Sequence, residues 1–190
     1  VDQKGLLGTD RLSELSPEQA RFARTQDGGM SMLDVVKKYK PTMLLGMTAV
    51  GGLFTEELIR ELSSNCDRPI IFPLSNPTVK AECTAEQAFE WTNGRCIFAS
   101  GSPFDPVEVL GKTYYPTQCN NMYIFPGLGL GATVAGASTI TDRMLYVAAE
   151  ALAKAVTPRE LEQGKVFPHI DTIRSVSHRV AVAVALEARR

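Results

Sequence analysis

Three short apolar stretches decide the fold: TMLLG at residues 42–46, IIFPL at 70–74 and CIFA at 96–99. Each is an almost unbroken apolar run bounded by turn-forming or polar residues, which is typical of a strand buried within a parallel sheet. Because proline has no N–H group to donate, we expect Pro73 at the end of the second strand. The sequence therefore predicts three parallel strands.

Helical patterns separate these three stretches. Thr55 is placed to cap a helix over residues 56–62, which carries two glutamates in its first turn. Thr84 and Gln87 form a capping-box pattern that begins a helix ending near Asn93. The alternation of strand and helix predicts an α/β fold with right-handed crossovers. We expect a Rossmann-like parallel sheet with helices on both faces, as in part of a doubly wound domain.

Further helices are expected on both sides of this core. Residues 16–19 (SPEQ) form a capped helix start, and residues 31–40 place apolar side chains at helical spacing. Residues 101–126 are rich in Pro, Gly and Asn and show no clear period. After them, helices are predicted over about 127–137 and 141–156, from 157 and from 171. We divide the chain into a partial Rossmann-like domain, residues 1–126, and a helical C-terminal segment packed on it, residues 127–190.

Length and composition exclude several classes of function. The chain has 190 residues, is 44% hydrophobic, and has a net charge of −1 from 20 Lys and Arg against 21 Asp and Glu. A chain of this length can bury a full core without disulfides or a structural metal. The balanced charge provides no basic stripe for a phosphate backbone, so we expect no nucleic-acid partner. The longest apolar runs, residues 43–47 and 122–137, are too short or too rich in Gly and Pro to cross a bilayer, which takes roughly 20 apolar residues, so we expect no membrane partner.

Cysteine and histidine usage suggests the compartment. The four cysteines lie far apart without a CxxC pair, and only His169 and His178 could join them, so the spacing of a zinc site is missing. Sparse thiols without a signal-peptide pattern indicate an intracellular protein, in the cytoplasm or an organelle matrix, with cysteines as small core residues. Because the chain opens at Val1 rather than Met, we expect it to be part of a longer protein.

Three loops follow the carboxyl ends of the predicted strands, where ligands bind in open parallel sheets. Residues 46–52 (GMTAVGG) allow close approach of a cofactor, and the helix after them offers free N–H groups, although glycine in a turn is often only structural. Residues 75–78 (SNPT) hold a neutral amide at Asn76, or form a plain Asx turn. Residues 100–104 open the long loop that later carries Asn120 and Asn121. Paired amides in a turn usually satisfy the backbone, but these two could approach Asn76.

Other chemistry-bearing motifs are missing from the chain. Residues 127–132 (GLGLGA) imitate a dinucleotide fingerprint but follow no credible strand, so we interpret them as close helix packing. There is no HExxH, GxSxG, P-loop or acid cluster with magnesium spacing. We therefore expect no catalytic acid or base and no metal ligand in this chain.

Distinctive motifs are spread over almost the whole chain. They are VDQKGL at 1–6, residues 40–55, SNPT at 75–78, AECTAE at 81–86, GR at 94–95, residues 98–104 and NNMYIFPG at 120–127. Their order and spacing resemble the carboxyl-terminal part of malic enzyme. Malic enzymes oxidise L-malate with NAD or NADP and decarboxylate the product to pyruvate and CO₂, using a divalent Mg or Mn ion, a lysine base and a tyrosine acid.

The resemblance implies a division of labour. The metal ligands, the lysine, the tyrosine and the first glycine-rich fingerprint would lie upstream of Val1, so this chain would be inactive alone and would need the missing N-terminal part as its partner. The implied contacts to L-malate are Asn76, Asn120 and Asn121. The implied contacts to NAD or NADP are Asp2 at the adenosine ribose and Gly46, Thr48, Gly51, Ser75 and Asn76 on the nicotinamide side. A homo-oligomer is also implied, because the family is commonly oligomeric.

Two positions depart from the family's pattern. Ala49 stands where the second nucleotide loop often has glycine, and Gln19 stands where NADP-using relatives tend to carry lysine. A neutral amide attracts a 2′-phosphate less than lysine does, which favours NAD slightly, unless Gln19 only serves its capping box. Two other functions remain open from the residues: a non-catalytic module that binds a nucleotide or a partner, and another doubly wound dehydrogenase for hydroxy or amino acids.

Overall fold

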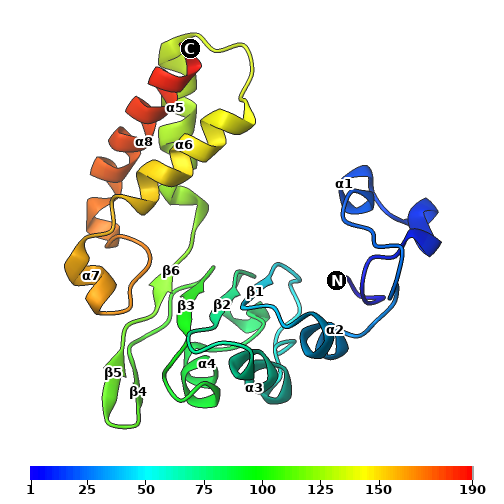
Figure 1. Cartoon of the computed structure of the whole chain (residues 1–190). Coiled ribbons are helices and arrows are strands. Elements are labelled where there is room, and N and C mark those ends of the chain that lie inside the picture. The colour runs from blue at the N-terminus through cyan, green and yellow to red at the C-terminus, as the bar shows by residue number, and fades with distance from the viewer. Residues whose placement is uncertain (190) are drawn as a thin grey trace.

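A four-stranded parallel sheet forms the centre of the computed structural model, which describes residues 1–189 (Figure 1). Its strands, in spatial order, are β1 (Met43–Gly46), β2 (Ile70–Pro73), β3 (Ile97–Ser100) and β6 (Thr117–Gln118). The three predicted strands are therefore confirmed, and Pro73 ends β2 as expected. All three ladders between neighbours are parallel.

Two helices cover one face of this sheet. α3 (Glu56–Ser64) begins after the cap Thr55, and α4 (Ala85–Trp91) begins after the capping box of Thr84 and Gln87. Both lie on the same side of the strands in Figure 1. Their apolar side chains pack with Ile71 and Phe98 of the sheet in one buried cluster. Burying these side chains, at about 1.5–3 kcal/mol each, stabilises the sheet against its helices.

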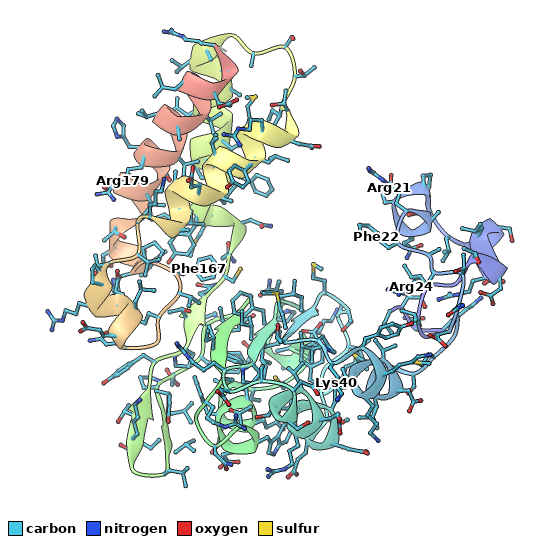
Figure 2. All side chains as sticks on the ribbon, viewed as in Figure 1. Arg21, Phe22, Arg24, Lys40, Phe167 and Arg179 are labelled. Carbon is cyan, nitrogen blue, oxygen red and sulfur yellow. The ribbon has the colours of Figure 1, made fainter. Side chains whose placement is uncertain are left out.

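The opposite face of β2 meets the C-terminal part of the chain. Successive strand residues point to opposite faces, so Phe72 turns away from the cluster that contains Ile71. Its ring lies 6.5 Å from the ring of Phe167, centroid to centroid. Figure 2 labels Phe167 between the tail and the sheet. The predicted α/β class, with a Rossmann-like parallel sheet and a helical tail, is confirmed.

The N-terminal segment is short and irregular. It contains a 3-10 helix, η1 (Thr9–Glu14), then α1 (Pro17–Ala20) and α2 (Met32–Tyr39). The predicted capping box at the start of α1 is present, because Ser16 and Gln19 bond to each other's backbone N–H groups. α2 packs against α3, and this contact joins the segment to the core.

Residues 101–126, which lack a period in the sequence, contain further elements. A hairpin joins β4 (Val107–Val109) to β5 (Lys112–Tyr114), and β6 follows it. Leu110 and Gly111 form the hairpin turn with φ of 52° and 74°. Positive φ at both central residues is the geometry that Asn-Gly usually provides. Because leucine occupies the first of these two positions, the sequence does not show the turn signal by which a hairpin is usually predicted.

The tail forms a second buried cluster of its own. It comprises η3 (Asn121–Tyr123), α5 (Phe125–Ala135), α6 (Asp142–Ala153), α7 (Pro158–Glu162), η4 (Ile170–Thr172) and α8 (Ile173–Ala188). α8 packs on both α5 and α6, as Figure 1 shows. Met144, Ala148, Val180 and Val184 are buried between these three helices.

Two cysteines belong to the core around the sheet. Cys83 and Cys96 are buried, and burial raises the pKa of the Cys83 thiol and raises that of Cys96 to about 11. Thiols in this state are protonated and serve as small apolar residues, as predicted. Cys66 and Cys119 are only half-buried. Within residues 1–189, none of the helices combines the length and the hydropathy of a membrane span.

Glycines in α5 allow the close approach of α8. A Cβ added at Gly127 would lie 2.6 Å from the Ser177 carbonyl oxygen, and one at Gly131 would lie 2.5 Å from that of Ala181. A Cβ at Gly129 would meet nothing within 4 Å. The interpretation of residues 127–132 as helix packing is confirmed.

We expect Gly131→Ala to destabilise the tail by about 1–3 kcal/mol, because the added methyl group forces α5 and α8 apart. Gly129→Ala is the matched control and should stabilise the helix by about 0.5–1 kcal/mol, since alanine favours helix and the site is open. Thermal unfolding of both variants checks this. Equal midpoints would contradict the packing role of Gly131.

Candidate functional site

The carboxyl ends of all four strands lie along one edge of the sheet, because the strands are parallel. The residues that follow them are 47–49 after β1, 74–76 after β2, 101–102 after β3 and 119–121 after β6. The predicted loops are therefore neighbours in the order in which their strands pair. We define these four segments as the carboxyl edge.

Glu82 joins the first two loops of the carboxyl edge. Its Oε1 accepts hydrogen bonds from the Thr48 N–H at 2.9 Å, the Thr48 hydroxyl at 2.8 Å and the Ser75 hydroxyl. The Ser75 oxygen in turn accepts the Ala49 N–H at 2.8 Å. One carboxylate and one hydroxyl thus fix the backbone of the β1 loop to the β2 loop.

The Glu82 side chain is completely buried. Burial by itself raises the pKa of this carboxyl. The hydrogen bonds from Ser75 and Thr48 together lower it by more than burial raises it, so the net pKa lies below its ordinary value. The carboxylate is therefore ionised at neutral pH. Gly46 leaves room for it, because a Cβ there would lie 2.4 Å from the carboxyl carbon of Glu82.

Asn76 links the second loop to the third. Its Oδ1 accepts a 2.6 Å hydrogen bond from the Ser102 hydroxyl, while its Nδ2 makes only a long 3.4 Å contact to the Leu74 carbonyl oxygen. Gly101 fits closely under this turn, since a Cβ there would lie 2.2 Å from the same Leu74 oxygen. The amide oxygen is therefore held by the protein, and the exposed residue can present its N–H groups to a ligand.

Backbone bonds connect the third loop to the fourth. The Cys119 N–H donates to the Ser100 carbonyl oxygen at 2.8 Å, and the side-chain Nε2 of Gln118 donates to the Gly101 carbonyl oxygen at 3.0 Å. Asn120 then caps η3, where its Oδ1 accepts the Met122 N–H at 3.0 Å. Asn121 is exposed in the first position of η3. Asn120 thus serves the backbone with its oxygen, as paired amides usually do, but its N–H groups remain available.

The backbone N–H groups of the loop after β1 are bonded within the protein. The N–H groups of Thr48 and Ala49 bond to Ser75 or Glu82, and that of Val50 bonds to the Thr48 hydroxyl at 3.1 Å. α3 begins only at Glu56, behind its own cap. The prediction of free N–H groups concerns the start of that helix. In residues 48–50 the protein uses the N–H groups itself to shape the loop.

The exposed part of this loop is uncharged and partly apolar. Met47 is 76% exposed and Val50 is 43% exposed. Ala49 adopts a φ of 56°, a left-handed conformation that glycine adopts more easily, which explains why glycine would suit this position. Such a surface fits a planar ring better than a phosphate group, because it presents no cation and few unused N–H groups.

Asp2 lies in the N-terminal segment, away from these loops in sequence. Arg11 donates to both of its carboxylate oxygens, at 2.7 and 2.9 Å, and the Lys4 N–H adds a third bond at 2.9 Å. The Arg11 guanidinium lowers the pKa of Asp2 as the largest of several causes. A carboxylate has about four acceptor positions, so one remains for a ribose hydroxyl.

The donor set of the carboxyl edge does not fit a divalent metal ion. It consists of neutral amides and hydroxyls, and the one carboxylate, Glu82, is engaged with Ser75 and Thr48. In the part of the chain that the structure describes, residues 1–189, no three His, Cys, Asp or Glu side chains are grouped so as to hold a metal.

Sequence reasoning missed Glu82, Ser102 and Gln118 as members of this site. Nothing in AECTAE distinguishes a buried glutamate from an exposed one, since glutamate is almost always exposed. The better signal is Gly46, because a glycine at the end of a buried strand indicates close approach by another group.

A family model described as "Malic enzyme, NAD binding domain" matches residues 1–189. The chain belongs to the malic enzyme family. It is 50% identical over 190 residues to an NADP-dependent malic enzyme of Dictyostelium discoideum, covering 99% of this chain and 35% of the relative. It is 49% identical over 188 residues to the chloroplastic NADP-dependent malic enzyme of Zea mays, covering 99% of this chain and 30% of the relative.

A solved structure supports the same fold. The crystal structure of Entamoeba histolytica malic enzyme matches 99% of this chain and 36% of that chain with a TM-score of 0.76, at 22% sequence identity. The chain thus spans about a third of the length of the malic enzymes it matches.

We expect the stabilising effect of Glu82 to depend on pH. Because its folded pKa lies below the ordinary value of 4.5, the ionised group stabilises the fold above pH 4.5, and this stability is lost as pH falls through the folded pKa. At pH 7, Glu82→Gln should lower the free energy of unfolding by about 1–3 kcal/mol, since the bonds to a charged acceptor weaken.

Denaturant unfolding of both proteins between pH 7 and pH 3 measures the difference. It should shrink below pH 4.5, and the exposed Glu90→Gln should show little difference at any pH. A constant difference across this range would contradict an ionised Glu82.

Proposed function

We propose that this chain is the cofactor- and malate-positioning part of a longer NAD(P)-dependent malic enzyme, which converts L-malate to pyruvate and CO₂. The observation that carries the proposal is a pair of hydrogen bonds: the Ser75 hydroxyl donates to Glu82, and the Ser102 hydroxyl donates to Asn76. Together they hold the turn that carries the neutral Asn76 amide at the carboxyl edge. The names of the relatives support the reaction. Because the chain spans about a third of those relatives, the acid, the base and the ligands of a Mg or Mn ion are proposed to belong to the remainder.

Asn76, Asn120 and Asn121 are proposed to bind L-malate. In Asn76 and Asn120 the amide oxygen already accepts a hydrogen bond from Ser102 or from the backbone of Met122. Their N–H groups are therefore the part that can reach a ligand, and an N–H group pairs with a carboxylate at every pH. Such amides can orient a dicarboxylate, but they cannot carry a proton between molecules.

Gly46, Thr48, Gly51, Ser75 and Asn76 are proposed to form the nicotinamide side of the cofactor site. Gly51 keeps this loop close to the next one, because a Cβ there would lie 2.5 Å from the Val79 carbonyl oxygen. These residues would hold NAD or NADP, which would supply an acceptor for the hydride from C2 of malate. Asp2, with its one remaining acceptor position, is proposed to bind the adenosine ribose.

The comparisons support a dinucleotide cofactor, NAD or NADP, without deciding between the two. The Oε1 atom of Gln19 accepts the Ser16 N–H at 3.0 Å, so this side chain is engaged in its capping box and supports no preference for NAD. The names of the relatives favour NADP. We propose NADP as the cofactor to test first, with NAD as the comparison.

The partners, the domain division and the cellular location are proposed as well. The partners are L-malate, the N-terminal part of the enzyme and further copies of the same protein. Residues 1–126 and 127–190 are proposed as a cofactor-binding domain and a helical segment. Two buried clusters support the division, although the second one also contains Tyr123, a few residues before this boundary. The free cysteines and the chloroplastic relative support a location inside the cell, in the cytoplasm or an organelle.

We expect the complete protein that contains this chain to form NADPH or NADH from L-malate with manganese, and the isolated 190-residue chain to be inactive. Absorbance at the wavelength of the reduced cofactor measures both. No malate-dependent reduction by the complete protein would contradict the enzyme proposal and favour a non-catalytic module. A different hydroxy or amino acid that outcompetes malate would favour another dehydrogenase.

Asn121→Ala in the complete protein should lower kcat/KM for malate roughly 10- to 150-fold, because a lost hydrogen bond to a carboxylate costs about 1.5–3 kcal/mol. Cofactor affinity should change little. The exposed Gln163→Ala in the tail is the control and should leave both values unchanged. An unaltered kcat/KM for Asn121→Ala would refute this assignment.

A further inference from the structure

Glu82 is a completely buried charged side chain to which the proposed function assigns no contact with a ligand. A buried carboxylate is costly unless hydrogen bonds replace its water, and here the replacement comes from two different loops. Thr48 supplies a backbone N–H and a hydroxyl from the loop after β1. Ser75 supplies its hydroxyl from the loop after β2, and its N–H makes a long 3.4 Å contact to Oε2.

The Glu82 carboxylate connects the loops after β1 and β2 just beyond the point where the backbone hydrogen bonds between the two strands end. The last bond of the β1–β2 ladder is donated by the Leu74 N–H to the Gly46 carbonyl oxygen at 2.8 Å. Thr48 and Ser75, the residues just beyond this bond, meet on Glu82. Two direct bonds also cross this gap, because the Thr48 and Ala49 N–H groups donate to the Ser75 hydroxyl oxygen at 3.0 and 2.8 Å. Without the carboxylate, Ser75 would lose the acceptor of its hydroxyl proton, and Thr48 would lose the acceptor of its own hydroxyl.

The backbone around Glu82 supports the far end of the same loop. The Gly52 N–H donates to the Ala81 carbonyl oxygen at 3.1 Å, and the Phe54 N–H donates to that of Glu82 at 2.9 Å. The side chain of Glu82 thus holds the start of the β1 loop while residues 81–82 hold its end. A single short segment determines the shape of the whole loop.

We propose that Glu82 is a positioning residue, which sets the spacing between the cofactor-binding loop after β1 and the Ser75–Asn76 turn. The proposal rests on the proposed function of these two loops. Glu82 does not touch the ligands itself and acts through Thr48 and Ser75. Its removal therefore weakens cofactor binding and misplaces Asn76, which is the next residue after Ser75.

Substitutions at Glu82 should give a graded effect. In Glu82→Gln, the amide oxygen can still accept the hydrogen bond from the Thr48 N–H. The NH₂ group, however, replaces the oxygen that faces the Ser75 N–H, and two donors cannot form a hydrogen bond with each other. Glu82→Ala removes every bond that the carboxylate makes and leaves only the direct bonds from the Thr48 and Ala49 N–H groups to the Ser75 hydroxyl oxygen, at 3.0 and 2.8 Å. Glu90→Gln, on the exposed side of α4, is the matched control for the loss of one negative charge.

The test measures the dissociation constant for NADP and for NAD, and then kcat and KM for malate at saturating cofactor, in the complete protein and these variants. Each measurement is made well below the thermal midpoint of that variant, with folding checked by circular dichroism. We expect Glu82→Gln to raise the dissociation constant about tenfold and to raise the KM for malate more than it lowers kcat. Glu82→Ala should have a larger effect, and Glu90→Gln should have none.

A second readout separates positioning from general stability. If Glu82 acts through Ser75, Ser75→Ala combined with Glu82→Gln should weaken cofactor binding little more than the stronger single variant. Additive losses would overturn the proposal. It would also be overturned if Glu82→Gln melts earlier but binds cofactor and malate with wild-type constants.

The two proposals fail in different ways. If the complete protein binds cofactor but does not oxidise malate, while Glu82→Gln still weakens binding, the reaction is wrong and the positioning role is supported. If the complete protein oxidises malate and Glu82→Gln has unchanged constants, the positioning role alone is wrong. A complete protein that binds neither NADP nor NAD would overturn both.

Discussion

The buried carboxylate of Glu82 is the interaction on which the arrangement of the site depends. It lies beyond the last backbone bond between β1 and β2 and gathers donors from the loops that follow both strands. Parallel strands bring their carboxyl ends to one edge, but the ladder does not fix what comes after. Glu82, Ser102 and Gln118 provide these connections in turn, so that four loops become one continuous edge.

The same hydrogen bonds decide what the edge can offer to a ligand. The amide oxygens of Asn76 and Asn120 accept hydrogen bonds from internal donors, so their N–H groups are the part of each amide that a ligand can use. The N–H groups of residues 48–50 are occupied by internal acceptors, which leaves a neutral and partly apolar loop. An edge that combines outward amide donors with a neutral loop suits a dicarboxylate next to a planar ring. It does not suit a metal ion or a phosphate chain, which need acids or free N–H groups.

The framework of the fold could be predicted from the sequence because it depends on local signals. Apolar runs bounded by breakers located β1, β2 and β3, and the caps Thr55 and Thr84 located the helices between them. The hairpin of β4 and β5 escaped prediction, because Leu110 stands where a turn-forming residue is normal. The position of Asn76 after β2 could be predicted from the strand order, but that of Asn120, which follows the unpredicted strand β6, and the hydrogen bonds of both amides could not.

Glu82 illustrates the limit of the sequence most clearly. Its burial results from contacts with residues 7 and 34 positions away, which no local pattern encodes. Conversely, the glycine of residue 46 is explained by the space that Glu82 needs, although a glycine there also suggested cofactor approach. Long-range polar contacts are therefore the part of this site that only the structure could reveal.

The central claim is that the four loops of the carboxyl edge form one binding site. A crystal structure of the complete protein grown with NADP and L-malate tests it most directly. The account predicts that the amide nitrogens of Asn76 and Asn121 contact malate carboxylates and that the nicotinamide ring lies against the loop after β1. Ligands bound elsewhere, or amides turned to separate faces of the molecule, would contradict it.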